Sequence, residues 1–226
     1  MSSKIDRALQ GPSWLEVTLG ALFSVILGAV LAAAWLVVKP VETVRELPKE
    51  PVKGTVYYIE GSTNSTQGRL GPRKQQSFIA GETVTVNEQE LNTVVKTLAA
   101  ETAKAAKDNK AEAASPGMIT PGALNFRIDE SELQMAAPVD LNVYGLIQAK
   151  VQVVAQGTFE RSGDKFAFTP SKFYVGSCRV DKLPIIGGLI LSKLLAAAAL
   201  PEEFTTAWGK LSDVTIEGSQ LQLVMP

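Results

Sequence analysis

Residues 17–38 read VTLGALFSVILGAVLAAAWLVV and contain no charged side chain. At a rise of about 1.5 Å per residue, an α-helix of this length reaches about 33 Å, which is enough to cross a hydrocarbon core of about 30 Å. Trp14 and Trp35 lie near the two ends, where amphipathic rings prefer the boundary between membrane and water. The stretch predicts one transmembrane helix over 14–38, with the rest of the chain held at a membrane surface.

The same stretch has one feature of a secretory signal peptide. Ala32-Ala33-Ala34 supplies small residues of the kind found at cleavage sites. The apolar part of a signal peptide usually runs for about 7 to 15 residues, whereas the apolar character here continues through Val38. We therefore expect an anchor that is retained, and cleavage is the alternative.

The charges that flank the helix give opposing indications of its orientation. Two basic residues precede it and four follow it, namely Lys4 and Arg7, then Lys39, Arg45, Lys49 and Lys53. A count of basic residues points the large domain into the cytoplasm. A short basic tail before a first helix usually stays in the cytoplasm, however, and long domains are translocated largely regardless of flanking charge. We expect a single-pass protein with a cytoplasmic N-terminus and an extracytoplasmic domain in the bacterial periplasm.

The composition argues against several classes of chemistry. The 226 residues include no histidine and one cysteine, Cys178, with 22 basic and 23 acidic residues. Without histidine a Ser–His–Asp triad cannot form, and the commonest metal ligand is missing. One thiol allows no internal disulfide and no thiolate zinc site within one chain. A net charge of −1 provides no field to attract nucleic acid. We expect a non-enzymatic protein with no cofactor, no metal and no nucleic-acid partner.

The remaining reactive groups have a simple structural explanation. Cys178 suits a small buried position, although the neighbouring Arg179 leaves a reactive thiol as the alternative. The carboxylates at Asp129-Glu130-Glu132 fit a turn, and Glu202-Glu203 fit the first turn of a helix.

Composition divides the chain into four parts. A polar tail covers 1–13, the membrane helix 14–38, a proline-rich segment 39–54, and one soluble domain 55–226. Proline fixes the backbone and lacks a hydrogen-bond donor, so we interpret 39–54 as a semi-rigid stalk.

Local patterns predict strand, loop, strand and helix at the start of the domain. Aromatic and β-branched residues favour a strand at 55–59, and the Gly, Ser and Pro content of 61–74 predicts a loop. After a strand at 83–86, NEQE from Asn87 has the spacing of a capping box for an amphipathic helix over about 88–107.

A period of two dominates the second half of the domain. Apolar and polar residues alternate from Ala123, with turns at Glu130-Ser131, Gly145 and Ser162-Gly163-Asp164. Such strands joined by short turns predict a long, curved antiparallel meander with one apolar face. The preceding span 108–122, rich in Ala, Lys and Gly, predicts a loop.

The C-terminal part predicts helices and a hairpin. The run 185–200, IIGGLILSKLLAAAAL, is too short for a comfortable second crossing and fits a buried helix or one on the membrane surface. Pro201 starts another helix that reaches about Lys210, and a hairpin turns at Glu217-Gly218-Ser219. The expected fold class is α+β, with an N-terminal transmembrane helix followed by a long curved antiparallel sheet packed against helices.

Two sets of residues are candidates for binding. A curved sheet that its helices cover incompletely leaves a groove for an acyl chain, whereas complete cover makes the same residues ordinary core. The groove candidates are Leu91, Val95, Leu98, Phe126, Ile128, Met135, Leu141, Val153, Phe159, Phe166, Phe168, Leu189 and Leu191. In the membrane helix the small residues Gly20, Ser24, Gly28 and Ala32 recur every four positions, which allows a second helix to approach closely or simply reflects how common such residues are in membrane helices.

Three stretches carry a resemblance to a known family. They are TVTVNEQELNTVV at 83–95, FRIDESELQMAAPVDL at 126–141 and FAFTPSKFYVGSCRVDKLPI at 166–185. Over about residues 80–226 the chain resembles YpmS-type membrane-anchored extracytoplasmic proteins of bacteria. More loosely it is similar to tubular lipid-binding domains, in which a long curved antiparallel sheet wraps a helix. The motifs that carry the resemblance are the E-x-E-L-N helix start and a turn with Val175-Gly176 and Leu183-Pro184. The resemblance implies a lipid or envelope role, and no catalytic residue comes with it.

Two hypotheses about function follow. The leading one is a membrane-anchored envelope protein that binds or shields lipid or another apolar ligand without catalysis. The alternative is a scaffold or assembly subunit, which meets a second copy or another membrane protein through its transmembrane helix and an open sheet edge.

Overall fold

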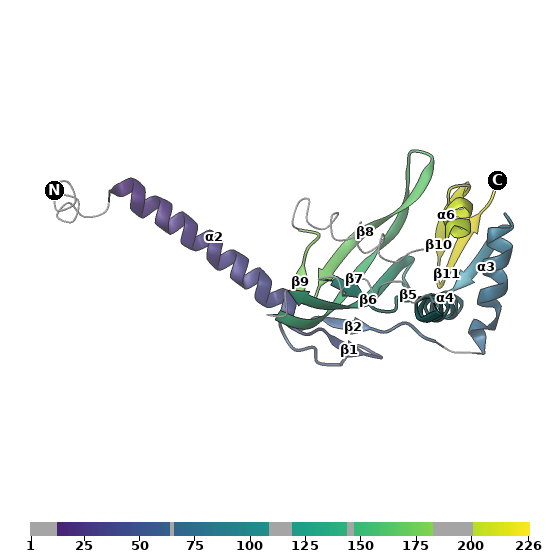
Figure 1. Cartoon of the computed structure of the whole chain (residues 1–226), viewed down its shortest axis with the longest axis horizontal. Coiled ribbons are helices and arrows are strands. Elements are labelled where there is room, and N and C mark those ends of the chain that lie inside the picture. The colour runs from purple at the N-terminus through teal and green to yellow at the C-terminus, as the bar shows by residue number, and fades with distance from the viewer. Residues whose placement is uncertain (1–12, 64–65, 109–118, 144–146, 183–200) are drawn as a thin grey trace.

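The apolar helix stands apart from the rest of the protein. The computed structural model describes residues 13–63, 66–108, 119–143, 147–182 and 201–226. Helix α2 (Trp14–Val38) extends away from the other elements as an isolated rod, and none of its residues is buried (Figure 1). Ser13 and Glu16 form a capping box at its start, each side chain accepting a hydrogen bond from the other residue's backbone N–H. Length, composition and exposure together give α2 the properties of a membrane anchor or a signal sequence.

The described elements are helices and strands in a mixed order. After α2 come β1 (Glu42–Val44), β2 (Tyr57–Ile59), the 3-10 helix η1 (Gln67–Leu70), α3 (Gly71–Ile79), β3 (Val84–Asn87) and α4 (Glu88–Asp108). The long strands follow as β4 (Ile119–Pro121), β5 (Asn125–Asp129), β6 (Glu132–Val143), β7 (Ile147–Ser162), β8 (Lys165–Val175) and β9 (Cys178–Arg179). The chain continues with α6 (Glu202–Trp208), β10 (Asp213–Glu217) and β11 (Gln220–Val224). This order is the predicted α+β class.

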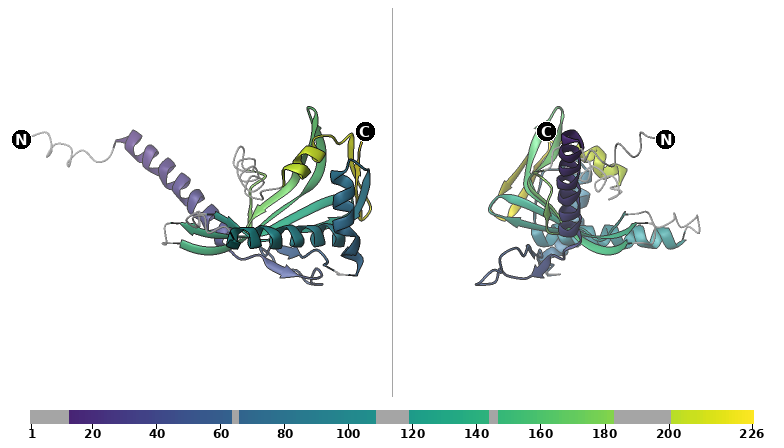
Figure 2. Two further views of the ribbon diagram at one scale, coloured as in Figure 1. Left: turned by 45° about the vertical axis from the view of Figure 1, so that its right-hand side comes forward. Right: turned by 90° about the vertical axis from the view of Figure 1, so that its left-hand side faces the viewer.

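Three sheets organise the described residues. The main sheet has the order β4-β6-β7-β8-β9, and β5 pairs with β6 beside β4; all of these pairings are antiparallel. A small antiparallel sheet has the order β10-β11-β3, and β1 pairs with β2 in parallel. The small sheet lies with α3 and α6 at the end of the domain remote from α2 (Figures 1 and 2). The predicted meander is therefore present, and the C-terminal hairpin joins β3 in a separate sheet.

The main sheet has one apolar face that runs along its whole length. Val151, Val153 and Ala155 of β7 are buried, whereas the residues between them are half-buried. The register places Val139 of β6 opposite Val151 and Phe173 of β8 opposite Ala155, so apolar side chains meet across the strands.

At the end remote from α2 this face is covered by the small sheet and by helices. We call this the distal cluster: Phe78, Val84, Val86, Ile128, Leu133, Ala207, Leu211, Val214, Leu221, Leu223 and Met225. Trp208 of α6 lies 5.5 Å from the ring of Phe159 and donates its indole N–H to the Phe166 carbonyl at 2.9 Å. These contacts fasten α6 to the β7–β8 hairpin.

At the other end the face reaches α2. The anchor-proximal cluster comprises Val139, Val151, Val153, Ala155, Phe173, Val175, Cys178 and Val180. Val37 from the last turn of α2 packs against it, and Phe168 packs against both clusters. Cys178 is buried here, as expected for a small core residue.

The prediction of a loop over 61–74 is wrong, because η1 and α3 occupy most of it. Pro72 stands in the first turn of α3, where its missing N–H removes no helical hydrogen bond. At Gly68 a Cβ atom would lie 2.0 Å from the Thr93 hydroxyl oxygen, so glycine allows η1 to press against α4. Glycine and proline indicated turns in this segment, but Gly68 allows close packing and Pro72 suits the start of a helix.

Two further segments differ from the sequence prediction. Within 39–54, β1 pairs with β2, and the Lys39 ammonium donates to the Gly54 carbonyl, so the stalk folds back toward the end of α2. Within 108–122, β4 pairs with β6 and is not loop. The first twelve residues of the tail, most of 108–122, the Gly145 turn and the 185–200 helix lie outside the described residues.

Helix α2 ends against the turn between β8 and β9. The Ser177 N–H donates to the Leu36 carbonyl at 2.9 Å, which satisfies an acceptor that a helix end leaves unpaired. The Gly176 N–H in turn donates to the Gln152 carbonyl of β7 at 2.8 Å. Gly176 has a φ of +58°, and a Cβ atom there would lie 2.0 Å from the Val37 carbonyl oxygen. The last turn of α2 is thereby fixed to the sheet through backbone groups.

Replacing Gly176 by alanine should separate α2 from the sheet. The new Cβ meets the helix backbone, so we expect amide hydrogen exchange over residues 174–179 to accelerate by about tenfold or more, in keeping with a local loss of about 1–3 kcal/mol. Exchange mass spectrometry on the full chain in detergent measures this. Gly218→Ala is the control, because Gly218 has nearly the same φ of +59° with nothing within 4 Å. Equal acceleration around both sites would contradict the helix contact.

Candidate functional site

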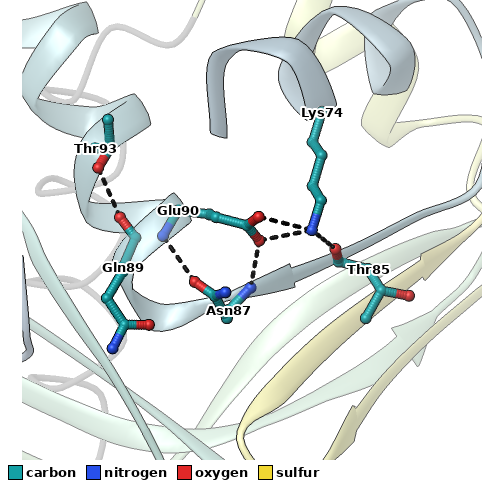
Figure 3. A network of polar contacts seen from close by, with 6 residues as sticks. All are labelled: Lys74, Thr85, Asn87, Gln89, Glu90 and Thr93. Atoms are coloured by element: carbon teal, nitrogen blue, oxygen red, sulfur yellow. Dashed lines mark hydrogen bonds and ion pairs between the residues drawn. The ribbon is translucent and has the colours of Figure 1, made fainter. Parts of the chain in front are cut away.

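The most deeply buried polar side chains of the described region lie at the start of α4. Glu90 is 2% exposed and Asn92 is 1% exposed. The Lys74 ammonium lies 2.8 Å from a carboxylate oxygen of Glu90 and donates to the Thr85 carbonyl at 2.7 Å (Figure 3). Asn87 and Glu90 exchange hydrogen bonds of 2.9 Å between side chain and backbone, which is the predicted capping box.

Two other residues of the E-x-E-L-N motif bind strand β5. The Asn92 amide accepts from the Phe126 N–H at 2.7 Å and donates to the Phe126 carbonyl at 2.8 Å. The Glu88 carboxylate accepts from the Ile128 N–H at 3.2 Å and also from the Ser62 N–H. Because β5 pairs with β6 on one side, these side chains satisfy backbone groups on its other side. Helix α4 therefore takes the place of a neighbouring strand.

This network holds the elements of the fold together. No buried side-chain nitrogen or oxygen in the described residues lacks a hydrogen-bond partner. Each carboxylate of the network is held by an ammonium or by backbone N–H groups. Sequence reasoning identified the cap but assigned no partner to Asn92. The sequence did offer a signal for the role of Asn92, because this polar residue directly follows Leu91, where the apolar stripe of the predicted helix begins.

The predicted groove residues divide between the two clusters of the apolar face. Ile128 belongs to the distal cluster, against which Leu91, Phe126, Met135, Phe159, Phe166 and Phe168 pack. Val153 belongs to the anchor-proximal cluster, against which Leu141 and Phe168 pack. Val95 and Leu98 are half-buried on α4, and Leu189 and Leu191 lie outside the described residues. The structure thus places the strand candidates on one face that continues from the distal end to the anchor.

An open pocket of about 340 Å³ lies between α3 and the region of α6. Its lining is Ile79, Glu202, Glu203, Thr206, Ala207 and Lys210, from α3 and the region of α6. The two carboxylates stand in the first turn of α6, as the sequence predicts for a helix start. A lining so rich in charge does not suit an acyl chain.

Among the described residues three titratable groups, Tyr58, Arg179 and Asp181, have displaced pKa values, and each moves away from neutrality. The hydrogen bond from the Arg179 guanidinium, at 2.9 Å, lowers the pKa of Asp181, which also accepts from the Phe173 N–H. Burial raises the pKa of Tyr58, whose hydroxyl donates to the Asn125 amide oxygen at 2.6 Å. Asp181 is therefore ionised and Tyr58 neutral at neutral pH, and both hold structure together. The Asp181 contribution to stability is lost only as the pH falls through its lowered pKa.

The two glycines in the row of small residues on α2 make no contact with the rest of the described chain. A Cβ atom added at Gly20 or Gly28 would have nothing within 4 Å. The Ser24 hydroxyl donates to the Gly20 carbonyl at 2.8 Å, so its polar group is satisfied within the helix, and Ala32 is exposed. This face of α2 is open to a second helix.

No protein-family model, characterised protein or solved structure matches this chain.

Replacing Asn92 by alanine should destabilise the domain. The change leaves the N–H and the carbonyl of the half-buried Phe126 without their side-chain partner, so we expect a loss of about 2–3 kcal/mol in the free energy of unfolding. Urea unfolding of the full chain in detergent, followed by tryptophan fluorescence, measures this loss. Thr97→Ala is the control, because the exposed Thr97 hydroxyl bonds only to its own helix at the Thr93 carbonyl. A loss at Asn92 no larger than at Thr97 would contradict the proposed role.

Proposed function

We propose that this protein is a non-enzymatic, single-pass protein of the bacterial envelope that binds or shields lipid or another apolar ligand. Helix α2 crosses the membrane with its N-terminus in the cytoplasm, and the domain lies outside the cytoplasm. The observation that carries the proposal is that α2 ends on the apolar face of the main sheet, where Val37 packs against the anchor-proximal cluster.

Physical chemistry supports lipid as the ligand at this place. Trp35 is 73% exposed in the last turn of α2, and such rings favour the membrane–water boundary. The anchor-proximal cluster therefore lies close to the level at which acyl chains begin. Burial of an acyl chain contributes about 0.8 kcal/mol per CH₂ group, so six or so groups would provide about 5 kcal/mol before the costs of ordering.

The margin of this cluster offers the surface that a chain would contact first. Leu141 and Ala149 lie opposite each other on β6 and β7, and both are only half-buried. Their neighbours along the strands, Val139 and Val151, are 2% and 3% exposed. The apolar face therefore changes from buried at the pair Val139 and Val151 to half-buried at the next pair, Leu141 and Ala149. The resemblance to YpmS-type and tubular lipid-binding proteins agrees with this use of a long curved sheet.

Lipid contact at this margin can be measured by photocrosslinking. The full chain is placed in phosphatidylcholine vesicles that carry a photoreactive group on the acyl chain, and crosslinked peptides are mapped by mass spectrometry. We expect crosslinks to the strand residues around 139–151 besides those to α2. Ala149→Phe fills the margin and should reduce the strand crosslinks about tenfold, the effect of about 1.4 kcal/mol. Gln148→Phe is the control, because Gln148 is exposed on the opposite face of the same strand. Crosslinks confined to α2 would overturn lipid binding.

A second candidate function is that of an assembly subunit. The open row of Gly20, Ser24, Gly28 and Ala32 favours it, because small residues let the backbones of two membrane helices approach. Strand β10 adds an edge of the small sheet that pairs with β11 on one side only among the described strands. The partner is a second copy of the chain or another membrane protein.

Bulk introduced on the small-residue row should disrupt such an assembly. We expect Gly20→Ile and Gly28→Ile to shift the protein to a smaller species in native gels of detergent-solubilised membranes. Ala29→Ile is the control, since position 29 is turned by about 100° from position 28 around the helix. Migration that stays the same in the Gly20 and Gly28 variants would exclude this row as an interface.

A further inference from the structure

Exposed aliphatic side chains gather beside the end of α2. Outside α2, the large hydrophobic residues that the described region leaves exposed are Leu47, Val52 and Leu70, at 63%, 65% and 51%. A single exposed aliphatic residue needs no explanation. Leu47 and Val52 are different, because both belong to one short connection between β1 and β2. We name residues 45–54 the juxtamembrane loop.

The loop is fastened next to the last residues of the membrane helix. Lys39 follows α2 directly, and its ammonium donates to the carbonyl of Gly54 at the end of the loop. At the start of this region the Glu42 N–H donates to the Val56 carbonyl at 3.0 Å. Both ends of the loop are thus tied to one another and to the C-terminal end of α2.

Within the loop, the backbone of Val52 is hydrogen-bonded while the side chains of Leu47 and Val52 are exposed. The Val52 N–H donates to the Tyr57 hydroxyl at 3.1 Å, and the Val52 carbonyl accepts from the Thr55 N–H at 3.2 Å. Val52 is therefore held in place with its side chain still exposed. The loop also contains three basic residues, Arg45, Lys49 and Lys53, against the two acidic residues Glu46 and Glu50.

These observations point to the surface of a lipid bilayer as the partner of the juxtamembrane loop. The exposed Trp35 and the first charge after the helix, Lys39, mark the boundary of the membrane on α2. A loop tied to Lys39 lies at that boundary, where aliphatic side chains gain by entering the interfacial region and ammonium groups gain by approaching lipid phosphates. The contact of α2 with Gly176 and Ser177 fixes the direction in which the loop leaves the helix.

We propose that the juxtamembrane loop is a second membrane-binding element, in which Leu47 and Val52 enter the lipid headgroup region and Arg45, Lys49 and Lys53 contact lipid phosphates. The proposal depends on the proposed function in one respect, namely that α2 is inserted in the bilayer. With two contacts to the membrane, the domain has a fixed height and tilt. The anchor-proximal cluster is then held at a constant distance from the bilayer.

The test places an environment-sensitive fluorophore on single cysteines in the full chain. Cys178→Ala provides the background, and the labelled positions are Leu47→Cys, Val52→Cys, Leu70→Cys and Ile26→Cys. The protein is reconstituted in vesicles of equal parts phosphatidylcholine and phosphatidylglycerol. Quenching is measured with lipids that carry a spin label at the headgroup or in the acyl chain, and with aqueous iodide. Leu70 is the matched control, because it is an exposed aliphatic residue next to α3, at the end of the domain remote from α2 (Figure 1).

We expect the labels at 47 and 52 to be quenched by headgroup-labelled lipid and to show about threefold less iodide quenching than the label at 70. The combined change Lys49→Gln and Lys53→Gln should weaken headgroup quenching at 52, and the loss should be larger in phosphatidylglycerol than in phosphatidylcholine alone. This second variant tests the native side chains rather than the apolar character of the label.

Three outcomes would overturn the loop contact. If the labels at 47 and 52 behave like the label at 70 while the label at 26 is quenched by acyl-chain spin labels, the anchor is inserted and the loop proposal alone fails. Protection of 47 and 52 from both iodide and lipid quenchers would show that a protein surface covers them, which also removes the proposal. If the label at 26 is not quenched by lipid, α2 is not inserted and the proposed function fails together with the loop contact.

Discussion

The backbone contact between the last turn of α2 and the Gly176-Ser177 turn is the constraint on which the arrangement of this protein depends. A helix end leaves carbonyl groups without partners, and here the Ser177 N–H satisfies one of them. The contact requires a residue without a side chain at Gly176, because any Cβ atom would collide with the Val37 carbonyl. The apolar helix is consequently joined to the sheet as a rigid extension of it. A flexible stalk would leave the orientation of the domain undefined, whereas this junction defines it.

A second constraint acts at the edge of the main sheet. Strand β5 pairs with β6 on one side, and the side chains of Glu88 and Asn92 satisfy its backbone on the other. An edge strand with unpaired groups invites association with another chain, and the start of α4 prevents this. The ion pair between the half-buried Lys74 and the buried Glu90 holds α3 against the same helix start. Buried polar groups here fix which elements meet, since each has one set of partners.

The two constraints together determine which half of the apolar face is covered and which half lies beside α2. Its distal half is closed by the small sheet, α3 and α6, so that half stabilises the domain. Its other half begins where α2 ends, beside the juxtamembrane loop with its exposed Leu47 and Val52. A domain fixed to a bilayer through both elements would present the margin at Leu141 and Ala149 to lipid. The proposed lipid binding, the proposed assembly through α2 and the proposed membrane contact of the loop all use surfaces that the folded domain leaves accessible near α2.

The sequence by itself determined the elements whose signals are local. An uncharged run of membrane length specified α2, the Asn87–Glu90 spacing specified the start of α4, and alternation of apolar residues specified β5 to β8. Tertiary structure alone decided the rest. In the sequence, Gly68 and Pro72 indicate a turn, but in the structure Gly68 allows a close helix contact and Pro72 stands at a helix start. Strands of three residues, such as β1 and β4, are too short to show a period. The sequence also could not distinguish the covered half of the apolar face from the half beside the anchor, because burial depends on contacts between residues far apart in the chain.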